Sequence, residues 1–435
     1  MKILHVSLGL PPFRTGGLNR YCADLMAEQV KCGDTVGLLY PAEFTPTEKT
    51  KIKKTEHKTF DLYRVINPLP VALTNGISAP SRYIKACGEP KVYRDFLCAY
   101  RPDVIHVHSF QGIHREFFEA AHEMGIRMVF TTHDFYPFCP TCVLLHRDGS
   151  ICSGAGSEKC SECNVGRGLS VKQEIIMQSR LYEKLKYSAV MKKIRGNQRK
   201  KNAERASDSQ NAVCTANESE YTALKEYYAD IFGLMDVVHC NSESTRDVYR
   251  QVFPDADYRT VCITHSGIKK TTHEKSENTL RIGFVGGLAS HKGLDVLLRA
   301  VKILDEKGTA YELYLYGADF SEYASANEKI HNGGVYTREN EDSVWKSFDI
   351  LVVPSEWHET FGLVVPEALA RGLRVICSDL VGAKQMLRDT DVFPHGSASE
   401  LAERILSDSI QPEITEDALS MEKHAQTIKN TIYTV

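Results

Sequence analysis

One stretch of the sequence says most about the architecture: Pro354-Ser355-Glu356-Trp357-His358-Glu359-Thr360-Phe361-Gly362-Leu363-Val364-Val365-Pro366-Glu367-Ala368-Leu369-Ala370-Arg371-Gly372. An apolar strand over 350–353 precedes it, a loop carries Glu359, and a helix is expected from about Gly362 with Glu367 on its body. A loop carboxylate and a helix carboxylate at this spacing can face one ligand at separate points. Backbone N–H groups at 361–363, near the start of the helix, would favour a phosphate.

Strands and helices alternate on both sides of this stretch. Strands that recur with helices between them are typical of parallel βαβ units, and ligands of such sheets bind at the carboxyl ends of the strands. The sequence therefore predicts an α/β protein of two Rossmann-like, doubly wound domains that face each other across a cleft. Strands are expected at 3–8, 35–40, 104–108, 128–132, 281–285, 313–316, 350–353 and 374–377, and helices at 18–31 and 294–306.

The 435 residues suffice for two large domains. We expect an N-terminal Rossmann-like domain over 1–265 and a second Rossmann-like domain over 266–415. A C-terminal helix is expected over 416–435, for which packing back on the first domain is one option. The alternation of strands and helices is interrupted at about 135–235, where we expect a Cys-rich and basic insertion.

The 354–372 stretch closely resembles the E-x7-E signature of retaining glycosyltransferases of the GT-B fold, specifically glycosyltransferase family 4 (glycosyltransferase group 1). The resemblance implies that Glu359 contacts the donor sugar and that Glu367 holds the nucleotide ribose. It also implies that 1–265 is the acceptor domain and 266–415 the nucleotide-sugar-binding domain. It is carried by Glu359, Phe361, Gly362, Leu363, Glu367, Ala368, Ala370 and Gly372. On spacing alone, a solvated Glu359 and a surface Glu367 would be equally acceptable.

Other segments resemble the same family. The run Phe284-Val285-Gly286-Gly287-Leu288-Ala289-Ser290-His291-Lys292-Gly293 looks like its phosphate loop, although Gly287 replaces the usual Arg. The resemblance implies that Lys292 neutralises the diphosphate of the donor. Val335 lies in the place of the base-binding loop, where the base usually meets backbone. Ser378–Gln385 is similar to a Gly-Gly…Glu loop but departs from it at Ala383 and Gln385.

The first half offers two matching features. Gly16 and Gly17 resemble the family's glycine-rich loop near the diphosphate, where bulkier residues would block the approach of the backbone. His133 follows an expected strand and matches the histidine that reaches the donor from the N-terminal domain. Taken alone, the glycines would fit a plain turn and the histidine a structural role.

Five cysteines cluster in the insertion. Cys139 and Cys142 form one C-x-x-C pair, and Cys160 and Cys163 form another, at the spacing of a four-Cys zinc site. Cys152 lies between them. The resemblance favours Cys139, Cys152, Cys160 and Cys163 as the ligands, with Cys142 as the alternative ligand. Such a zinc ion would be structural, and free thiols or a redox disulfide are the other interpretation.

The charge balance is nearly even, with 53 Lys and Arg against 56 Asp and Glu, so nothing draws the whole chain to nucleic acid or membrane. Without a signal peptide or a long apolar run, we expect a cytoplasmic protein. A basic segment, Lys184–Arg205, allows peripheral contact with the inner face of a membrane, although a solvated helical face explains it slightly better.

The sequence thus predicts a retaining hexosyltransferase. Its donor would be a UDP- or GDP-sugar and its acceptor a glycan or a lipid-linked molecule, as in bacterial surface polysaccharide biosynthesis. No cofactor is expected for catalysis, no metal for transfer, and no nucleic acid as a partner. The alternatives are another GT-B enzyme, such as a nucleotide-sugar epimerase or a phosphorylase, and a zinc-stapled nucleic-acid-binding protein.

Overall fold

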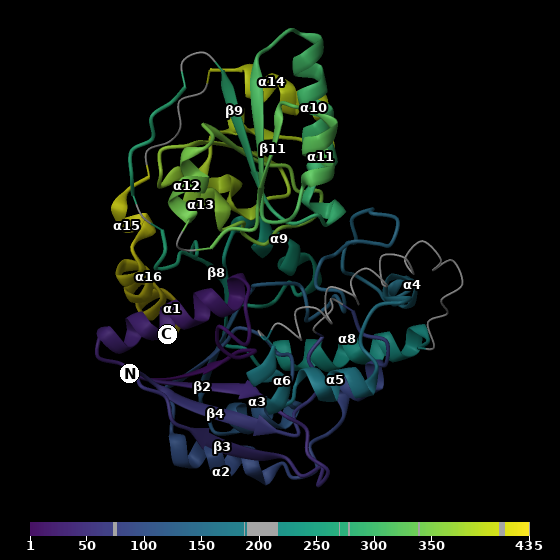
Figure 1. Ribbon diagram of the computed structural model, residues 1–435. Coiled ribbons are helices and arrows are strands. Elements are labelled where there is room, and N and C mark those ends of the chain that lie inside the picture. Colours follow the sequence, from purple (N-terminus) through teal and green to yellow (C-terminus); the bar gives the residue numbers. More distant parts are fainter. Residues whose placement is uncertain are drawn as a thin grey trace. The chain divides into compact units, whose positions relative to one another are not determined.

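The structure is a computed structural model that describes residues 1–72, 76–186, 188, 216–268, 270–276, 279–337, 340–408 and 414–434. The chain forms two units, each built around its own sheet (Figure 1). The first unit comprises Met1–His239, Val248–Arg259 and Ala425–Val435, and the second comprises Cys240–Asp247 and Thr260–His424. The last residues of the chain therefore belong to the same unit as the first ones.

The first unit contains an eight-stranded sheet in the order β3-β4-β2-β1-β5-β6-β7-β8. β1 pairs in parallel with β2 and β5, and β5, β6 and β7 continue in parallel. The carboxyl ends of these strands therefore share one edge. The bounds are β1 Lys2–Val6, β2 Thr35–Pro41, β3 Lys51–Thr55, β4 Asp61–Ile66, β5 Val104–Val107, β6 Arg127–Thr131, β7 Val237–Cys240 and β8 Tyr258–Thr260.

Apolar strands and amphipathic helices explain how this unit packs. The central strand β1 reads Ile3-Leu4-His5-Val6 and is fully buried, as expected for a strand covered on both faces. Helix α1 (Gly17–Lys31) places Cys22 and Met26 against Val36 and Leu38 of β2. Helices α2 (Lys91–Tyr100) and α3 (Arg115–Glu123) follow, with α2 beside β3 (Figure 1).

The predicted insertion at 135–235 contains short helices and one long helix. The short helices are α4 Cys160–Asn164, α5 Val171–Met177 and α6 Arg180–Leu185. The long helix α8 (Glu218–Phe232) leads into β7, which pairs in parallel with β6. It is therefore the crossover helix of a βαβ unit and part of the basic fold. Most of the basic segment, from Lys192 to Arg205, lies outside the described residues.

The second unit contains a six-stranded sheet in the order β11-β10-β9-β12-β13-β14. Its neighbouring strands pair in parallel across the described residues, so the carboxyl ends of β9, β11 and β12 lie at one edge. The bounds are β9 Leu280–Val285, β10 Tyr311–Tyr316, β11 Ile330–Gly334, β12 Ile350–Val353, β13 Arg374–Ser378 and β14 Val392–Phe393. The prediction of two doubly wound α/β sheets is confirmed.

Helices cover this second sheet. Helix α10 (Leu294–Glu306) packs beside α14 (Ala398–Leu406), and Val296, Leu297 and Leu401 are fully buried in the core that the two helices share with the strands. The others are α11 Ser321–Ala326, α12 Glu341–Lys346, α13 Val364–Leu369, α15 Glu416–Leu419 and α16 Met421–Ile428. A π-helical turn, η6 (Lys429–Tyr433), follows α16 and ends the described chain in the first unit.

Candidate active site

Glu359 lies in the loop that follows β12 in the second unit. Its Oε1 accepts a hydrogen bond from Lys292 Nζ at 2.9 Å, and its Oε2 accepts one from Ser355 Oγ at 2.6 Å. The side chain is 15% exposed. Burial raises the pKa of Glu359, but the charge of Lys292 and the two hydrogen bonds outweigh it, so the pKa lies below its usual value. The carboxylate is therefore ionised and fixed in one orientation.

Backbone contacts hold this loop in place. Glu359 N donates to Leu380 O at 3.1 Å, and Gly382 N donates to Glu359 O at 2.9 Å. Ser378, the last residue of β13, donates through Oγ to Ser355 O at 2.6 Å. The loop after β12 is thus tied to the loop after β13 on both sides of the carboxylate.

Lys292 reaches Glu359 because of a glycine beside it. Lys292 ends the short 3-10 turn η3 (Ser290–Lys292), and Gly293 follows with φ 73°. A Cβ on Gly293 would lie 1.8 Å from the carbonyl oxygen of Pro354, so only glycine allows the two loops to approach this closely. The Lys292 ammonium also lies 5.2 Å from the centre of the Trp357 ring.

These groups line a cavity of about 110 Å³ at the carboxyl ends of β9 and β12. Its polar walls are Lys292, Ser355 and Glu359, and the rest is apolar. The remaining lining residues are Phe284, Val285, Val352, Val353, Pro354, Leu363 and Val364. A cation and a carboxylate in an apolar setting can stabilise opposite charges that develop on one ligand.

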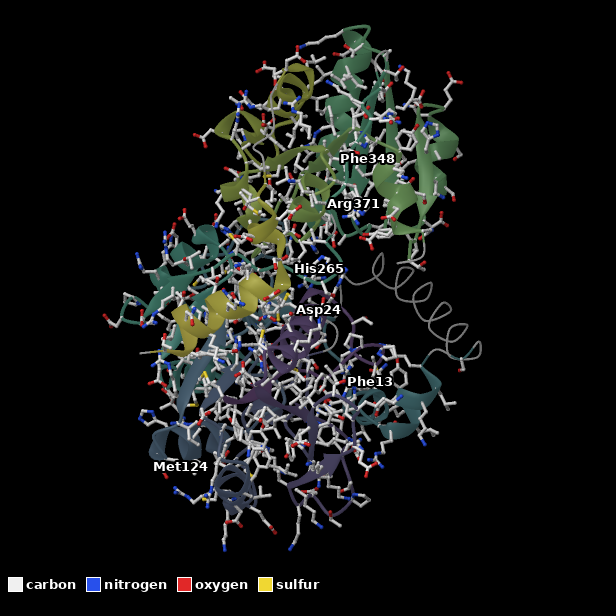
Figure 2. The ribbon with its side chains drawn as sticks, turned by 90° about the vertical axis from the view of Figure 1, so that its left-hand side faces the viewer. Phe13, Asp24, Met124, His265, Phe348 and Arg371 are labelled. Atoms are coloured by element: carbon white, nitrogen blue, oxygen red, sulfur yellow. The ribbon has the colours of Figure 1, made fainter. Side chains whose placement is uncertain are left out.

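Glu367 lies on α13 and does not line this cavity. Its Oε1 is 2.6 Å from Nε2 of His265, which is buried and is labelled in Figure 2. Arg371, also labelled there, donates through Nη1 to Glu367 O at 2.9 Å. Sequence reasoning missed His265, because no motif connects residues so far apart in the chain.

The remaining predicted donor residues lie near these groups along the chain. Phe361 is buried, Gly362 has φ 93°, and Leu363 lines the cavity. Helix α13 begins at Val364, two residues later than expected. Gly287 and Val335 follow β9 and β11 at the same edge of the sheet; Gly287 is exposed and Val335 is 74% exposed.

In the first unit, Gly16 and Gly17 lie at the start of α1. Gly16 has φ 119° and precedes the helix as its N-cap. No atom lies within 4 Å of the position that a Cβ would take at Gly16, and both glycines are exposed. The glycine is therefore required by the backbone conformation and not by a neighbouring side chain.

His133 follows β6 in the first unit and belongs to a buried network of imidazoles. Its Nε2 lies 3.1 Å from Nδ1 of His108, and Nε2 of His108 lies 2.9 Å from Nδ1 of His5. Burial lowers the pKa of His133 to about 3 and that of His5 to about 4, and it lowers the pKa of His108 well below its usual value. These rings are neutral at physiological pH. Sequence reasoning found only His133.

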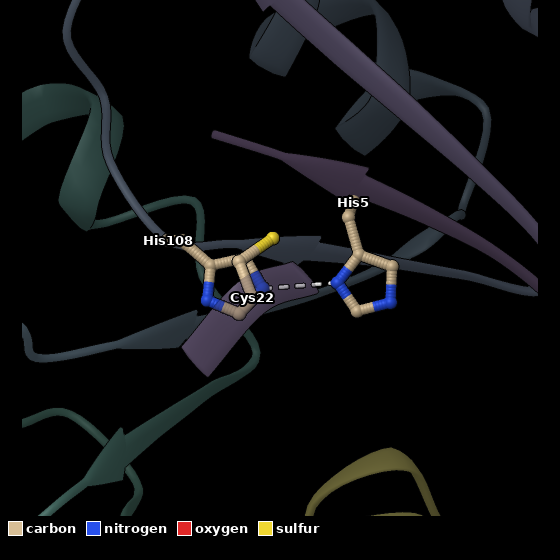
Figure 3. Close-up of side chains that lie close together, drawn as sticks. All are labelled: His5, Cys22 and His108. Atoms are coloured by element: carbon tan, nitrogen blue, oxygen red, sulfur yellow. Dashed lines mark hydrogen bonds between the residues drawn. The ribbon is translucent and has the colours of Figure 1, made fainter. Parts of the chain in front are cut away.

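His5, Cys22 and His108 lie so close that they could hold a metal ion. Their ligand atoms lie within 4.8 Å of one another, and Figure 3 shows the three side chains with the His5–His108 hydrogen bond. Within the described ranges, no other group of three or more such residues meets this distance. Burial raises the pKa of the Cys22 thiol to about 12, however, and its Sγ lies 3.8 Å from Met26 Sδ.

The predicted zinc ligands surround a second cavity, of about 230 Å³. Cys139, Cys152, Cys160 and Cys163 line it, whereas Cys142 does not. The Sγ of Cys142 instead lies 3.9 Å from Nε2 of Gln111 in the buried interior. The four lining sulfurs do not lie within 4.8 Å of one another, so a bound ion would have to draw them together.

One hairpin and one lysine hold this Cys-rich loop. His146 N donates to Ser150 O at 2.8 Å, and Cys152 N donates to Leu144 O at 2.8 Å. Lys225 of α8 donates to Gly154 O at 2.7 Å and to Gly156 O. Gly154 N donates to Cys152 Sγ at 3.4 Å.

In the described part of the chain, no helix has both the length and the apolar character needed to cross a bilayer.

Two family models match the chain. The model described as "Glycosyl transferases group 1" matches residues 267–428, and the one described as "Glycosyltransferase Family 4" matches residues 15–151. Together they cover more than half of the chain, and each falls mainly on one of the two units.

Curated relatives match parts of the sequence. Phosphatidyl-myo-inositol mannosyltransferase of Mycobacterium leprae is 29% identical over 124 residues, which are 27% of this chain and 33% of that protein. An uncharacterized 42.6 kDa protein in the cps region of Klebsiella pneumoniae is 20% identical over 303 residues, 68% of this chain and 63% of that protein. The chain thus spans less than two thirds of the length of the curated relatives it matches.

Solved structures resemble the whole chain. Sucrose-phosphate synthase from Thermosynechococcus elongatus has a TM-score of 0.52 at 14% identity, covering 100% of this chain and 95% of that one. A glycosyltransferase from Rickettsia africae has a TM-score of 0.52 at 13% identity, covering 99% of this chain and 97% of that one. The predicted two-domain GT-B fold is confirmed.

Proposed function

This chain belongs to the group 1 glycosyltransferases of family 4, and on that premise we propose that it transfers a hexosyl group from a nucleoside-diphosphate sugar to a hydroxyl acceptor. The arrangement of Lys292, Glu359 and Ser355 around one cavity supports this proposal most directly. A diphosphate leaving group needs a cation, and the reacting sugar needs a carboxylate that stays ionised as positive charge grows on it. The pKa of Glu359, held below its usual value by Lys292 and the hydrogen bonds despite burial, meets the second need.

Four side chains act on the donor in the proposed reaction. Lys292 turns from Glu359 towards the diphosphate as the bond between the sugar C1 and the phosphate oxygen breaks. Glu359, still bonded to Ser355, accepts hydrogen bonds from the sugar hydroxyls. Glu367, oriented by His265, binds the ribose hydroxyls, and the flat base lies against Val335.

We further propose that the configuration at the sugar C1 is retained and that no metal is needed for transfer. Among the described residues, Glu359 is the only aspartate or glutamate that lines the cavity. We therefore assign no second carboxylate as nucleophile and propose front-face substitution. Lys292 supplies the positive charge that a divalent cation would otherwise provide. His133 and the backbone at Gly16 and Gly17 serve the donor from the first unit.

The acceptor is proposed to be a glycan or a lipid-linked molecule. One relative is named a phosphatidyl-myo-inositol mannosyltransferase, and two others are described as proteins in the cps region of Klebsiella pneumoniae. These names support an acceptor of this kind. A place in the cytoplasm beside a membrane is a separate part of the proposal. Vesicle flotation with anionic lipid tests the membrane contact.

The Cys-rich loop is proposed to carry a structural zinc ion. Four thiols around one cavity, with Lys225 holding the loop, fit the donor set of such a site better than any set that includes Cys142. The ion would have no part in the transfer itself, because protein sulfurs would occupy all four of its positions.

Thermal stabilisation by UDP, GDP and ADP tests the donor site. A structure from E. coli that resembles the chain with a TM-score of 0.53 was solved with bound UDP-2-fluoro glucose, so the uridine nucleotide is tried first. One nucleotide is expected to raise the melting temperature of the wild type and of Glu306→Ala, an exposed control on α10, but not of Glu367→Ala. No shift from any of the three would overturn the proposal.

The same nucleotide separates the enzyme classes. A transferase converts its sugar conjugate to free nucleotide only when an acceptor is present or water replaces it. An epimerase would change the sugar without an acceptor, and a phosphorylase would need inorganic phosphate. We expect nucleotide to be released without added phosphate, and we expect the sugar of the remaining donor to be unchanged.

A further inference from the structure

Two short helices of the first unit, α5 and α6, expose apolar side chains to solvent. In the described part of the chain, nine large apolar side chains are exposed, and five of them lie on these two helices, which pack beside each other (Figure 1). The five side chains are between 43% and 67% exposed and are called the α5–α6 patch below: Val171, Ile175, Ile176, Leu181 and Leu185. Such a concentration marks a surface that binds another molecule.

The inner side of α5 is polar. Glu174 is 1% exposed, accepts a hydrogen bond from Tyr83 Oη at 2.6 Å and pairs with Arg82. Gln178, one turn later, is 3% exposed, and its Oε1 accepts a hydrogen bond from Val71 N at 3.2 Å. A surface helix of a globular protein normally turns its apolar side chains inwards and its polar ones outwards. Helix α5 has the reverse arrangement, so burial in the core of the first unit does not explain its apolar residues.

Helix α6 separates its apolar and charged side chains. Leu181 and Leu185 are one turn apart and share a face. Arg180 and Lys184 are also one turn apart and share another face; Arg180 lies 3.5 Å from a carboxylate oxygen of Glu43 and is still 59% exposed. The exposed charges of the two helices are one acid, Glu183, and three cations, Lys172, Arg180 and Lys184. The apolar patch is therefore flanked by positive charge.

The sequence after α6 adds to this charge. From Lys184 to Arg205 it contains nine Lys and Arg residues and one Glu, most of them outside the described residues. A surface that combines apolar side chains with cations is complementary to a bilayer with anionic head groups, because the apolar side chains enter the boundary of the acyl chains while the cations meet the phosphates. The two helices supply the apolar part of this combination.

A second copy of the chain fits the patch less well. In a symmetric dimer the patch would face itself, so the cations of one copy would lie opposite the cations of the other. The two helices are also only seven and six residues long, whereas a stable interface takes about 20–30 residues a side. An anionic bilayer meets neither difficulty.

The patch adjoins the loop that follows β1. Lys186, at the C-cap of α6, donates from Nζ to Phe13 O at 2.6 Å. Phe13, labelled in Figure 2, shortly precedes Gly16 and Gly17 in the sequence. Because β1 ends at Val6, this loop lies at the carboxyl edge of the first sheet. A bilayer on the patch would therefore meet the ligand-binding edge of the unit that is expected to take the acceptor.

We propose that the α5–α6 patch inserts into the head-group region of an anionic lipid bilayer, with Lys172, Arg180 and Lys184 on the lipid phosphates beside it. The proposal rests on the part of the proposed function in which the acceptor is lipid-linked. It differs from attraction by the basic sequence alone, because named side chains enter the bilayer. The polar contacts of Glu174 and Gln178 hold α5 with its apolar side chains outwards.

A tryptophan placed in the patch measures insertion directly. Ile176→Trp and the control Leu406→Trp, at an exposed position of α14, are bound to vesicles of phosphatidylglycerol and phosphatidylcholine with brominated acyl chains. Bromine quenches a fluorophore only where the fluorophore enters the bilayer. We expect Ile176→Trp to be quenched beyond the wild-type background of Trp345 and Trp357, and Leu406→Trp to match that background. Equal quenching of all three proteins, or no binding to the vesicles, would overturn the proposal.

Two double variants separate insertion from charge attraction. Ile176→Ser with Leu181→Ser removes the two most exposed side chains of the patch and should lower the vesicle partition coefficient by about tenfold or more. Lys172→Gln with Lys184→Gln should weaken binding more at low salt than at high salt. The matched controls are on the exposed surface of the second unit: Leu406→Ser for the first variant, and Lys302→Gln with Lys307→Gln for the second.

Other occupants of the patch give different results. If the serine double variant binds vesicles as well as the wild type does, the basic sequence alone makes the contact and the proposal fails. If the wild type forms dimers in analytical ultracentrifugation and the serine variant does not, the patch belongs to a second copy, which also overturns it. The substituted side chains are exposed, so the melting temperature of the serine variant should stay at the wild-type value, and misfolding is then not the cause of weaker binding.

Failure of this proposal is distinguishable from failure of the proposed function. The nucleotide that stabilises the wild type should stabilise the serine variant equally, because the residues proposed to bind it, Lys292 and Glu367, lie in the second unit. Insertion of the patch in a protein that no nucleotide stabilises would contradict the proposed function alone. A nucleotide shift in a protein whose patch does not insert would overturn the membrane proposal alone.

Discussion

The proposed role of Glu359 depends on its charge as well as its shape. Lys292 donates to one of its carboxylate oxygens and Ser355 to the other. Glu359→Gln keeps the shape and removes the charge. We expect kcat/KM to fall by roughly 10²–10³-fold, as for the loss of one electrostatic contact to a transition state. Steady-state transfer from the donor identified by thermal shift measures it.

Glu356→Gln is the matched control for this change, because Glu356 lies on the same loop but outside the cavity. It should retain nearly full activity. Both variants should keep the thermal shift that the free nucleotide causes, since the nucleotide is proposed to bind through Lys292 and Glu367. Equal activity of the two variants would remove Glu359 from the mechanism.

Alanine substitutions at two glycines with nearly the same φ distinguish backbone strain from steric conflict. Gly293 has φ 73° and Gly308 has φ 69°, but only at Gly293 would a Cβ meet another atom, Pro354 O at 1.8 Å. Gly293→Ala should therefore lower the free energy of unfolding by about 1–3 kcal/mol more than Gly308→Ala. Urea unfolding of both variants provides the comparison. Equal losses would mean that the two loops adjust freely.

At the scale of elements, the sequence predicts the strands that are apolar throughout. All of the expected strands are present, with bounds within two residues of those expected in the first unit. The hairpin of β3 and β4 was missed because β3, Lys51-Ile52-Lys53-Lys54-Thr55, is a largely exposed edge strand with little apolar signal. Helix α8 was assigned to an insertion because polar sequence precedes it.

The candidate site was predictable only where neighbours in sequence are neighbours in space or a family motif connects them. Glu359 and Lys292 came from motifs, and their hydrogen bond joins residues 67 positions apart. His265 and the buried network of imidazoles have no such signal. Each of these histidines lies on a strand or loop, and no motif connects it to its partners. Their partners are defined by the order of strands in the sheet, which composition and periodicity do not contain.

The Cys-rich loop supplies a prediction at the same scale. Metal analysis of purified protein is expected to give one zinc per chain, lost in Cys160→Ser and in Cys163→Ser. Cys142→Ser should keep the zinc, because the Cys142 sulfur faces Gln111 and lies outside the cavity that the other four line. Protein without zinc, or a site that needs Cys142, would contradict the proposed ligand set.

At the scale of the whole molecule, the histidines whose pKa is lowered by burial are distributed unevenly between the two units. In the first unit, burial lowers the pKa of His5 and His114 to about 4, that of His133 to about 3, and that of His108 well below its usual value. Unfolding lets these groups take up protons near pH 6.5, so their contribution to stability is present above that pH and is lost as the pH falls towards 4. Burial raises the pKa of Asp134 to about 6 and also raises that of Glu183, and both act in the opposite sense, but they are two groups against four.

This imbalance predicts that mild acid destabilises the first unit more than the second. Both tryptophans, Trp345 and Trp357, lie in the second unit, so tryptophan fluorescence follows that unit while far-UV circular dichroism follows both. Between pH 7.5 and pH 5, the urea midpoint of the fluorescence transition should shift little. The circular dichroism transition should broaden or split, with an early phase that fluorescence does not show. Coincident transitions at both pH values would mean that the two units unfold together, and that the histidine network does not give the first unit its own response to acid.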